Sequence, residues 1–264
     1  EQDPAVVARL LRVANSALYA RSRRISDVQR AVVTLGPTSV IGIVMSYQFV
    51  EMKSELDDVT TLPFLNIVRH SIATAFLARH LVQRTPSFPS LDVSLNERAG
   101  EAYTAGLMHD FGKVVLLYNS PEDAAMYYST PAESAEDAAA IDHEAQEQTL
   151  FGHTHASVGS FLLSKLTFPQ RLQDVIAQHH AEGDEAPQDR SDQHLVAVLQ
   201  AANLAAHGLG YGTIPHEDWE GCQADPTWER LATTTPIGYG TAEALTETVA
   251  SAQEDLALYI GAML

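Results

Sequence analysis

The sequence predicts an all-α protein, and three observations favour that class. Apolar residues recur at spacings of three and four over most of the 264 residues, which is the period of a helix with one buried face. Pro, Ser, Thr and Asp stand where these periodic segments begin, and Gly or Pro stands where several of them end. Apolar and polar residues do not alternate over any run long enough to require a sheet.

The first third of the chain contains four predicted helices. Pro4 fits the first turn of a helix, because its missing N–H is not needed there. Ser26 and Asp27 can cap a second helix, and the Gly36-Pro37 pair ends it. We expect helices over residues 4–20, 26–36, 38–53 and 63–84, with a basic loop at 21–24 and a polar link at 54–61.

The rest of the chain continues the helical pattern up to an irregular stretch, residues 208–239, which is rich in Gly, Pro, Thr and Trp. Gly112 is expected to break the chain before the apolar run 114–118. The acidic residues of the segment 132–148, Glu147 among them, are expected on a solvated helix face. We expect helices over residues 95–109, 121–129, 132–148, 156–166, 169–180, 193–207 and 242–262.

Charge and composition exclude several classes of protein. The chain has 34 Asp and Glu against 16 Lys and Arg, a formal net charge of −18. Such a charge repels phosphate groups, so we expect no direct binding to nucleic acid or to an anionic membrane. The apolar run 40–50 is shorter than the roughly 20 residues of a membrane span. A lone Cys222 and no signal peptide favour the cytoplasm, and the missing initiator Met suggests a fragment of a longer protein.

Histidines carry the strongest functional pattern. His70 lies inside a predicted long helix, His109-Asp110 follows another, and His153, His155 and the pair His179-His180 stand near helix ends. Imidazole and carboxylate groups are ligands of divalent metals, and helical folds bring such groups from separate helices into one cavity. The spacing lacks the short intervals of a zinc finger or a metalloprotease helix. Two interpretations therefore stay open, a metal site and a polar network that caps helix ends.

The residue types within seven segments identify a protein family more specifically than this spacing does. These segments are 3–17, 25–36, 69–71, 105–113, 151–159, 168–169 and 179–180. Over about residues 1–210, in the right order, they resemble the family called HDOD, the HD-related output domain. The pair Asn15-Ser16 and the later Leu35-Gly36 distinguish this resemblance from one to generic HD phosphohydrolases.

The resemblance implies a two-lobed helical domain of bacterial signalling proteins, often placed after a receiver or other sensory domain. Its partner would be a signalling protein or that upstream receiver or sensor domain, and its oligomeric state is not implied. We expect an N-terminal lobe at residues 1–55 without the usual start of the family, an HD-like helical core at 56–210, and an irregular segment with a C-terminal helix at 211–264.

Related HD enzymes, including the HD-GYP cyclic-dinucleotide phosphodiesterases, bind two or three metals. Lys113 matches the lysine of their HD-x-G-K motif and would be the catalytic lysine if the chain were an enzyme. The implied metal is divalent, one of Fe, Mn, Zn and Ni. The positions of this chain that match the metal ligands are His70, His109, Asp110, His155, His179 and His180.

The chain departs from those enzymes at three places. Asn66 and Asn203 stand where carboxylates are expected, and no Gly-Tyr-Pro motif follows His180. An amide brings no negative charge, so it lowers affinity for a divalent cation. We therefore expect a non-catalytic signalling output module that acts through protein contacts. A metal-dependent HD-type phosphohydrolase, or a sensor of a ligand or metal, are the alternatives.

Other polar and aromatic residues are expected to have structural or solvent-facing roles. Asn15 and Ser16 are expected to pack or cap a helix. Trp219 and Trp228 are expected to pack the irregular segment onto the core. The remaining residues are expected at the surface: Arg21, Arg23, Arg24, His143, His153, His194, His207 and His216.

Overall fold

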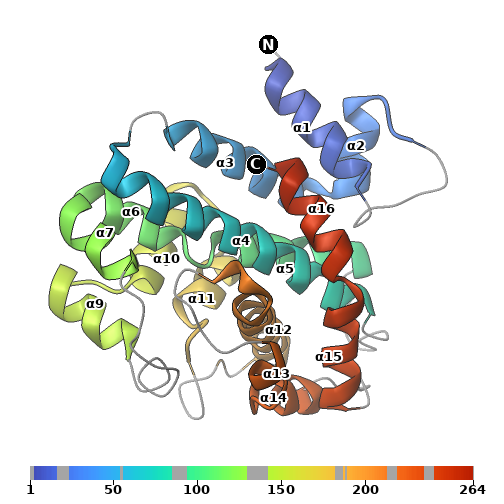
Figure 1. Cartoon of the computed structure of the whole chain (residues 1–264). Helices are drawn as coiled ribbons and strands as arrows, with labels where there is room; N and C mark the ends of the chain where they lie inside the picture. Colours follow the sequence, from blue (N-terminus) through green and yellow to red (C-terminus); the bar gives the residue numbers. More distant parts are fainter. Residues whose placement is uncertain are drawn as a thin grey trace.

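The structure is a computed structural model, and it describes residues 3–16, 24–53, 56–84, 94–129, 142–181, 187, 189–212, 219–234 and 241–263. Helices and short turns account for these residues, with no strand among them, which confirms the all-α prediction. In chain order the helices are α1 (Pro4–Ala14), α2 (Val28–Leu35), α3 (Pro37–Met52), α4 (Asp58–Arg84), α5 (Leu95–Met108), α6 (Phe111–Asn119), α7 (Pro121–Ser129), α9 (His143–Phe151), α10 (His155–Lys165), α11 (Gln170–Ala177), α12 (Arg190–Ala206), the π-helix η4 (His207–Tyr211), α13 (Trp219–Gln223), α14 (Thr227–Thr234), α15 (Ala242–Ser251) and α16 (Gln253–Met263) (Figure 1).

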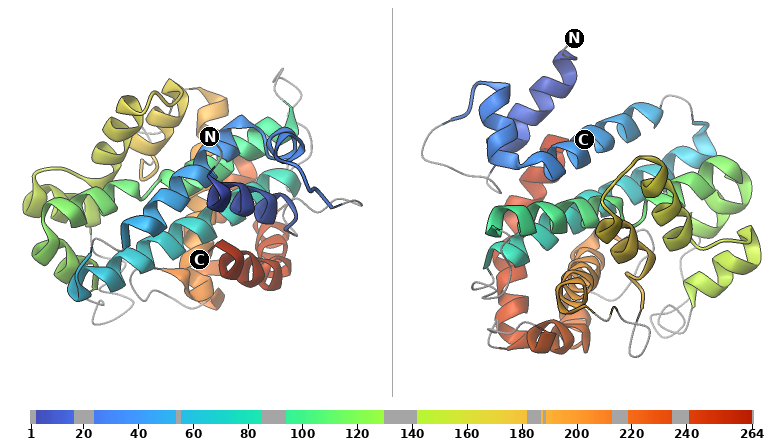
Figure 2. Two further views of the ribbon diagram at one scale, coloured as in Figure 1. Left: turned by 90° about the horizontal axis from the view of Figure 1, so that it is seen from above. Right: turned by 180° about the vertical axis from the view of Figure 1, so that it is seen from behind.

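Helices α1, α2 and α3 pack on one another at one side of the molecule (Figures 1 and 2). The predicted first helix was too long, because α1 ends at Ala14. The Asn15 amide donates to the carbonyls of Leu11 and Ile25, at 2.7 and 2.8 Å, and accepts from the Ile25 N–H at 2.8 Å. This side chain therefore fixes residue 25 beside the end of α1, which confirms its expected packing role.

Helix α4 crosses the centre of the molecule, and α5 and α12 pack against it (Figure 1). It begins at Asp58 rather than at Pro63, because Asp57 caps it by accepting the Thr60 N–H at 2.8 Å. The crossing of α4 and α5 is close at Gly106, where an added Cβ would lie 2.7 Å from the Cα of Ala75. This close crossing brings His70 near the end of α5.

The segment expected to be irregular is largely helical where the structure describes it. It contains η4, α13 and α14. Trp228 is 0% exposed, and its indole N–H donates to the Cys222 carbonyl at 2.8 Å. The Trp219 ring lies 6.1 Å from it, centroid to centroid, so the expected packing role of both tryptophans is confirmed.

The C-terminal segment forms two helices instead of the single one expected, because the chain turns at Ala252 between α15 and α16. Helix α16 contacts both α4 and α1. The hydroxyls of Tyr103 on α5 and Tyr259 on α16 are 2.8 Å apart inside the core. The C-terminal helix thus joins the core to the N-terminal helices.

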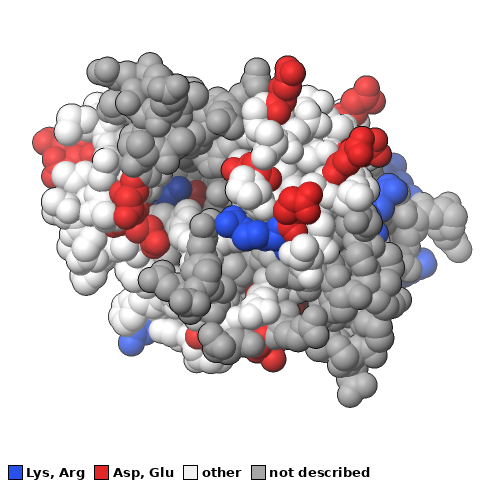
Figure 3. Space-filling model, turned by 90° about the horizontal axis from the view of Figure 1, so that it is seen from below, with Lys and Arg blue, Asp and Glu red and all other residues white. Residues whose placement is uncertain are grey.

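Asp and Glu side chains are scattered over the face shown in Figure 3, with a few Lys and Arg between them. Within the described segments, no single helix combines the length and the apolar composition that a membrane crossing requires. One helix pair, 28–35 with 39–45, meets both requirements only when its two parts are taken together, and these are bent by 110°.

Candidate metal centre

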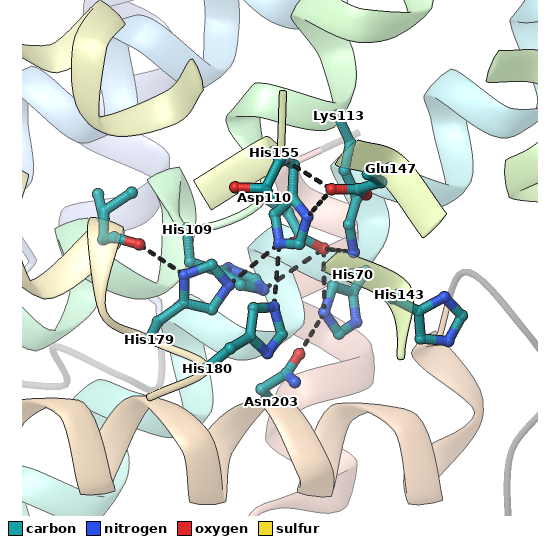
Figure 4. Close-up of polar contacts among 12 residues, drawn as sticks. His70, His109, Asp110, Lys113, His143, Glu147, His155, His179, His180 and Asn203 are labelled. Atoms are coloured by element: carbon teal, nitrogen blue, oxygen red, sulfur yellow. Dashed lines mark hydrogen bonds and ion pairs between the residues drawn. The ribbon is translucent and has the colours of Figure 1, made fainter. Parts of the chain in front are cut away.

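Several helix ends meet beside the middle of α4, and all six predicted ligand residues lie there (Figure 4). His70 projects from α4, His109 follows the last residue of α5, and Asp110 precedes α6. His155 is the first residue of α10. The pair His179-His180 follows α11, which ends at Ala177 rather than at residue 180 as expected.

Asp110 is the central carboxylate of this cluster. Its Oδ2 accepts a hydrogen bond from Lys113 Nζ at 2.8 Å, and lies 3.4 Å from His109 Nε2 and 3.7 Å from His70 Nε2. Its Oδ1 lies 3.4 Å from His155 Nε2. Because α6 begins immediately after Asp110, the short link between α5 and α6 sets the position of this side chain.

Three imidazoles complete the other side of the cluster. His155 Nε2 lies 3.0 Å from His180 Nε2 and 3.3 Å from His179 Nε2. The possible ligand atoms fall into two groups of three, each within 4.8 Å of one another: His70 with His109 and Asp110, and His155 with His179 and His180. Asp110 Oδ1, facing His155, links the two groups.

Backbone carbonyls fix the orientation of three of these rings. His109 Nδ1 lies 2.9 Å from the Gly106 carbonyl oxygen, and His179 Nδ1 lies 2.7 Å from that of Ile176. His70 Nδ1 lies 3.2 Å from the carbonyl oxygen of Tyr211. A carbonyl only accepts, so in His109 and His179 Nδ1 carries the ring proton and, in the neutral ring, Nε2 has a free lone pair. In His70 both ring nitrogens face an oxygen, because Nε2 also lies 2.7 Å from Asn203 Oδ1. Outer hydrogen bonds of this kind are typical of metal-binding histidines.

The protonation states leave the cluster rich in acceptors. Burial lowers the pKa of His70 to about 3 and also lowers the pKa values of His109 and His179, so these rings are neutral near pH 7. Burial opposes ionisation of Asp110, but the Lys113 ammonium group, 2.8 Å from Oδ2, outweighs it and the pKa of Asp110 stays well below its usual range. Asp110 is therefore a carboxylate.

Two of these acceptors are left without a donor. His109 Nε2 and Asp110 Oδ1 are buried and accept no hydrogen bond from any residue that the structure describes. Buried lone pairs that face one another without a proton between them cost free energy, and a cation relieves that cost. The imidazole and carboxylate donors therefore fit a divalent cation of the borderline class.

Asn203 on α12 occupies the edge of this cluster. Its Oδ1 lies 2.7 Å from His70 Nε2. Asn203 is one of the two positions at which the resemblance to HD enzymes implies a carboxylate. Asn66, the other expected carboxylate position, is half-buried one turn before His70 on α4. At Asn203 the cluster therefore contains a neutral amide oxygen and not the carboxylate that the resemblance implies.

Glu147 is the important residue that the sequence reasoning placed wrongly. It was expected on a solvated helix face, yet it is 0% exposed. Its Oε2 lies 2.6 Å from His155 Nδ1 and accepts the backbone N–H of His155 at 2.7 Å. The useful sequence indication was Gly152, which ends α9 with a φ of 75° and turns the chain so that residues 147 and 155 face each other.

Gly112 has a different role from the predicted break. It lies inside α6, and an added Cβ would overlap the backbone carbonyl of His155. Helices α6 and α10 therefore meet backbone to backbone, with Gly159 on the other side of the contact. This close contact places His155 beside Asp110.

The surface predictions for the other histidines hold only in part. His153 is exposed, as expected. His194 is 7% exposed, and the ring of His207 is half-buried 4.6 Å from that of His70, so for these two the prediction was wrong. His143 is half-buried, with Nδ1 2.9 Å from the Tyr127 hydroxyl. His216, Arg21 and Arg23 lie outside the described residues, and Arg24 is exposed.

Comparison with protein families and curated proteins gives related sequences. The HDOD domain model matches residues 1–182. Ribonuclease Y of Acholeplasma laidlawii is 31% identical over 137 residues, which are 52% of this chain and 17% of that protein. An uncharacterised protein of Treponema pallidum is 24% identical over 216 residues, 82% of this chain. The chain spans 38% of that second relative, so it covers a minor part of both.

Three solved structures share the fold, each over 99% of this chain. An HDOD domain protein of unknown function from Geobacter sulfurreducens has a TM-score of 0.62 at 22% identity, with 82% of its chain covered. A proposed signal transduction protein from Marinobacter aquaeolei VT8 has a TM-score of 0.64 at 19% identity, with 53% of its chain covered. A proposed phosphohydrolase from Shewanella amazonensis has a TM-score of 0.62 at 21% identity, with 84% of its chain covered.

Proposed function

The chain belongs to the HDOD domain family, and from that premise we propose that it is a bacterial signal-transduction output module. In this proposal it acts through contacts with a signalling protein or an upstream receiver or sensor domain. It holds a divalent metal, one of Fe, Mn, Zn and Ni, without hydrolysing a substrate. A fold neighbour proposed to act in signal transduction supports the signalling part.

The metal-binding part rests mainly on the orientation of the rings. His109 and His179 donate their Nδ1 protons to backbone carbonyls and present Nε2 to the cluster, and His70 Nε2 lies 3.7 Å from Asp110 Oδ2. Asp110 Oδ1 and His109 Nε2 are buried acceptors without a donor from the described residues. A metal would be held by the predicted set, His70, His109, Asp110, His155, His179 and His180.

The non-hydrolytic part rests on charge. Two positions expected to be carboxylates are the amides Asn66 and Asn203, so Asp110 is the one carboxylate of the predicted ligand set. Fewer anionic ligands weaken binding of divalent cations, and a site with two metals suffers more than a site with one. Lys113 Nζ lies 2.8 Å from Asp110 Oδ2, so its ammonium group already balances that carboxylate.

A metal-dependent phosphohydrolase is the second candidate. The observation that favours it is the position of Lys113, whose half-buried ammonium group lies at the cluster and could bind a phosphate oxygen. When bound, a divalent metal would act as a Lewis acid and lower the pKa of a bound water. One fold neighbour is a proposed phosphohydrolase, which is consistent with this candidate.

The two candidates differ in metal content and turnover. The first measurement is elemental analysis of protein produced with iron, manganese, zinc and nickel. The second is hydrolysis of bis(p-nitrophenyl) phosphate and of a cyclic dinucleotide. His109→Ala and Asp110→Ala remove ligands, and His153→Ala changes an exposed histidine two residues from His155 as the matched control.

We expect near-stoichiometric metal in the wild type and in His153→Ala, its loss in the two cluster variants, and no turnover in any of them. Turnover that both cluster variants abolish would establish the phosphohydrolase instead. A wild type without metal, with a fold unchanged in Asp110→Asn, would refute the metal-binding part and favour the polar network.

A further inference from the structure

The buried carboxylate of Glu147 stands behind His155, on the side of the ring away from the proposed metal (Figure 4). We infer that Glu147 is a positioning residue: it fixes the ring proton of His155 on Nδ1 and thereby aims Nε2 at the metal. This inference rests on the metal-binding part of the proposed function. It adds a residue of α9 that lies outside the predicted ligand set.

The hydrogen-bond geometry sets the form of the imidazole. Glu147 Oε2 lies 2.6 Å from His155 Nδ1, a short distance typical of a hydrogen bond to a charged acceptor. An ionised carboxylate only accepts, so the proton between the two groups belongs to Nδ1. Nε2 of His155 is on the opposite edge of the ring, 3.4 Å from Asp110 Oδ1 and 3.0 Å from His180 Nε2.

The start of α10 keeps Glu147 ionised although it is buried. His155 is the first residue of α10, and its backbone N–H has no partner inside the helix, so Glu147 Oε2 accepts it at 2.7 Å. The positive end of the helix dipole favours a carboxylate there. Burial opposes ionisation, but the hydrogen bonds from the ring and backbone of His155 and the charge of Lys113 lower the pKa of Glu147.

Tyr128 holds the other oxygen of the same carboxylate. Its hydroxyl donates to Glu147 Oε1 at 2.9 Å, and the residue is buried on α7. With one oxygen on Tyr128 and the other on His155, the carboxylate cannot rotate without breaking a hydrogen bond. Three helices, α7, α9 and α10, thus fix the direction of one imidazole.

A carboxylate behind a ligating histidine also raises the basicity of the ring, and loss of such outer partners lowers metal affinity about 10- to 100-fold. A residue that only capped α10 would affect folding and leave the ring proton and the metal affinity unchanged. The proton on Nδ1 and the affinity for a metal ion are therefore the two readouts that separate positioning from capping.

The test uses the full chain, first freed of metal with a chelator and then titrated with Co²⁺. Nitrogen-15 NMR of the histidine rings reports which nitrogen of His155 carries the proton. The variant Glu147→Gln keeps the shape and removes the charge. Glu144→Gln, earlier on α9, is the matched control, and Tyr128→Phe keeps the carboxylate but removes one of its hydrogen bonds.

We expect the metal-free wild type to show a far-downfield Nδ1 proton on His155, which moves upfield in Glu147→Gln. Co²⁺ should bind Glu147→Gln about 10- to 100-fold more weakly than the wild type, with a changed visible spectrum. Glu144→Gln should match the wild type in both readouts, and Tyr128→Phe should fall between. Thermal unfolding followed by circular dichroism identifies variants that fail to fold.

The inference is overturned if the proton of His155 lies on Nε2 in the wild type. It is equally overturned if Co²⁺ binds Glu147→Gln as tightly as it binds the wild type. A wild type that binds no Co²⁺ refutes the proposed metal instead, and the NMR comparison without metal then decides the role of Glu147 alone.

Discussion

The substitution Gly106→Ala should destabilise this protein, although Ala is the better helix former. Gly106 lies inside α5, where Ala would normally be favoured by about 1 kcal/mol. Its added Cβ would lie 2.7 Å from both the Cα and the N of Ala75 and 2.9 Å from the carbonyl carbon of Thr74. These are backbone atoms of α4, so no side-chain rotation can relieve the overlap.

The magnitude follows from these distances. Nonbonded carbon atoms rest about 3.5–4.0 Å apart, so α4 and α5 would have to separate by about 1 Å. Overpacking of this kind costs roughly 1–3 kcal/mol, which exceeds the gain in helix propensity. The Gly106 carbonyl also accepts the Nδ1 proton of His109, so a shift of α5 moves a proposed ligand and should weaken metal binding.

Gly261→Ala is the matched control, because Gly261 lies in α16 with nothing within 4 Å of an added Cβ. It should stabilise the protein by about 0.5–1 kcal/mol. Urea unfolding of both variants measures the difference, which we expect to be about 2 kcal/mol. If Gly106→Ala were as stable as Gly261→Ala, the close crossing of α4 and α5 would be wrong.

Two further predictions concern the amides. Asn15→Ala removes three hydrogen bonds that join Leu11 and Ile25, so it should lower the free energy of unfolding by about 1–3 kcal/mol. The substitution Ser26→Ala, at an exposed residue, should leave the free energy of unfolding unchanged. Equal midpoints of urea unfolding for the two variants would contradict the role of Asn15. Asn203→Asp should raise Co²⁺ affinity about tenfold or more by adding an anionic ligand, yet lower the melting temperature of the metal-free protein, because the new charge lies near Asp110. The exposed Asn96→Asp should change neither quantity, and unchanged Co²⁺ binding by Asn203→Asp would place Asn203 outside the metal site.

The composition predicted where most carboxylates lie, but it predicted the wrong position for Glu147. The net charge of −18 indicates many surface carboxylates, and Figure 3 shows such side chains on one face. Glu147 belongs by sequence to an acidic segment, so its composition favoured a solvated position. It is nevertheless buried, because Tyr128, His155 and the start of α10 together offset the cost of removing a charge from water.

The helix boundaries were predictable where a local group decides them. Ser94 and Glu97 cap each other at the start of α5, and Pro121 opens α7 where the sequence placed it. The end of α1 was not predictable, because the bonds of Asn15 reach Ile25, ten residues further along the chain. A helix end that is fixed by contacts with distant residues cannot be predicted from the spacing of apolar residues.

The all-α class, the HDOD resemblance and the residues of the histidine cluster were predictable from the sequence, since these depend on residue type, period and order. The contact of Asn203 with His70 and the position of Glu147 behind His155 follow from the three-dimensional packing and were not predictable from the sequence. The rings of His109 and His179 are held by carbonyls only three residues earlier in the chain. The partners of His70 and His155 come from other helices, so only the packing of the helices brings them together.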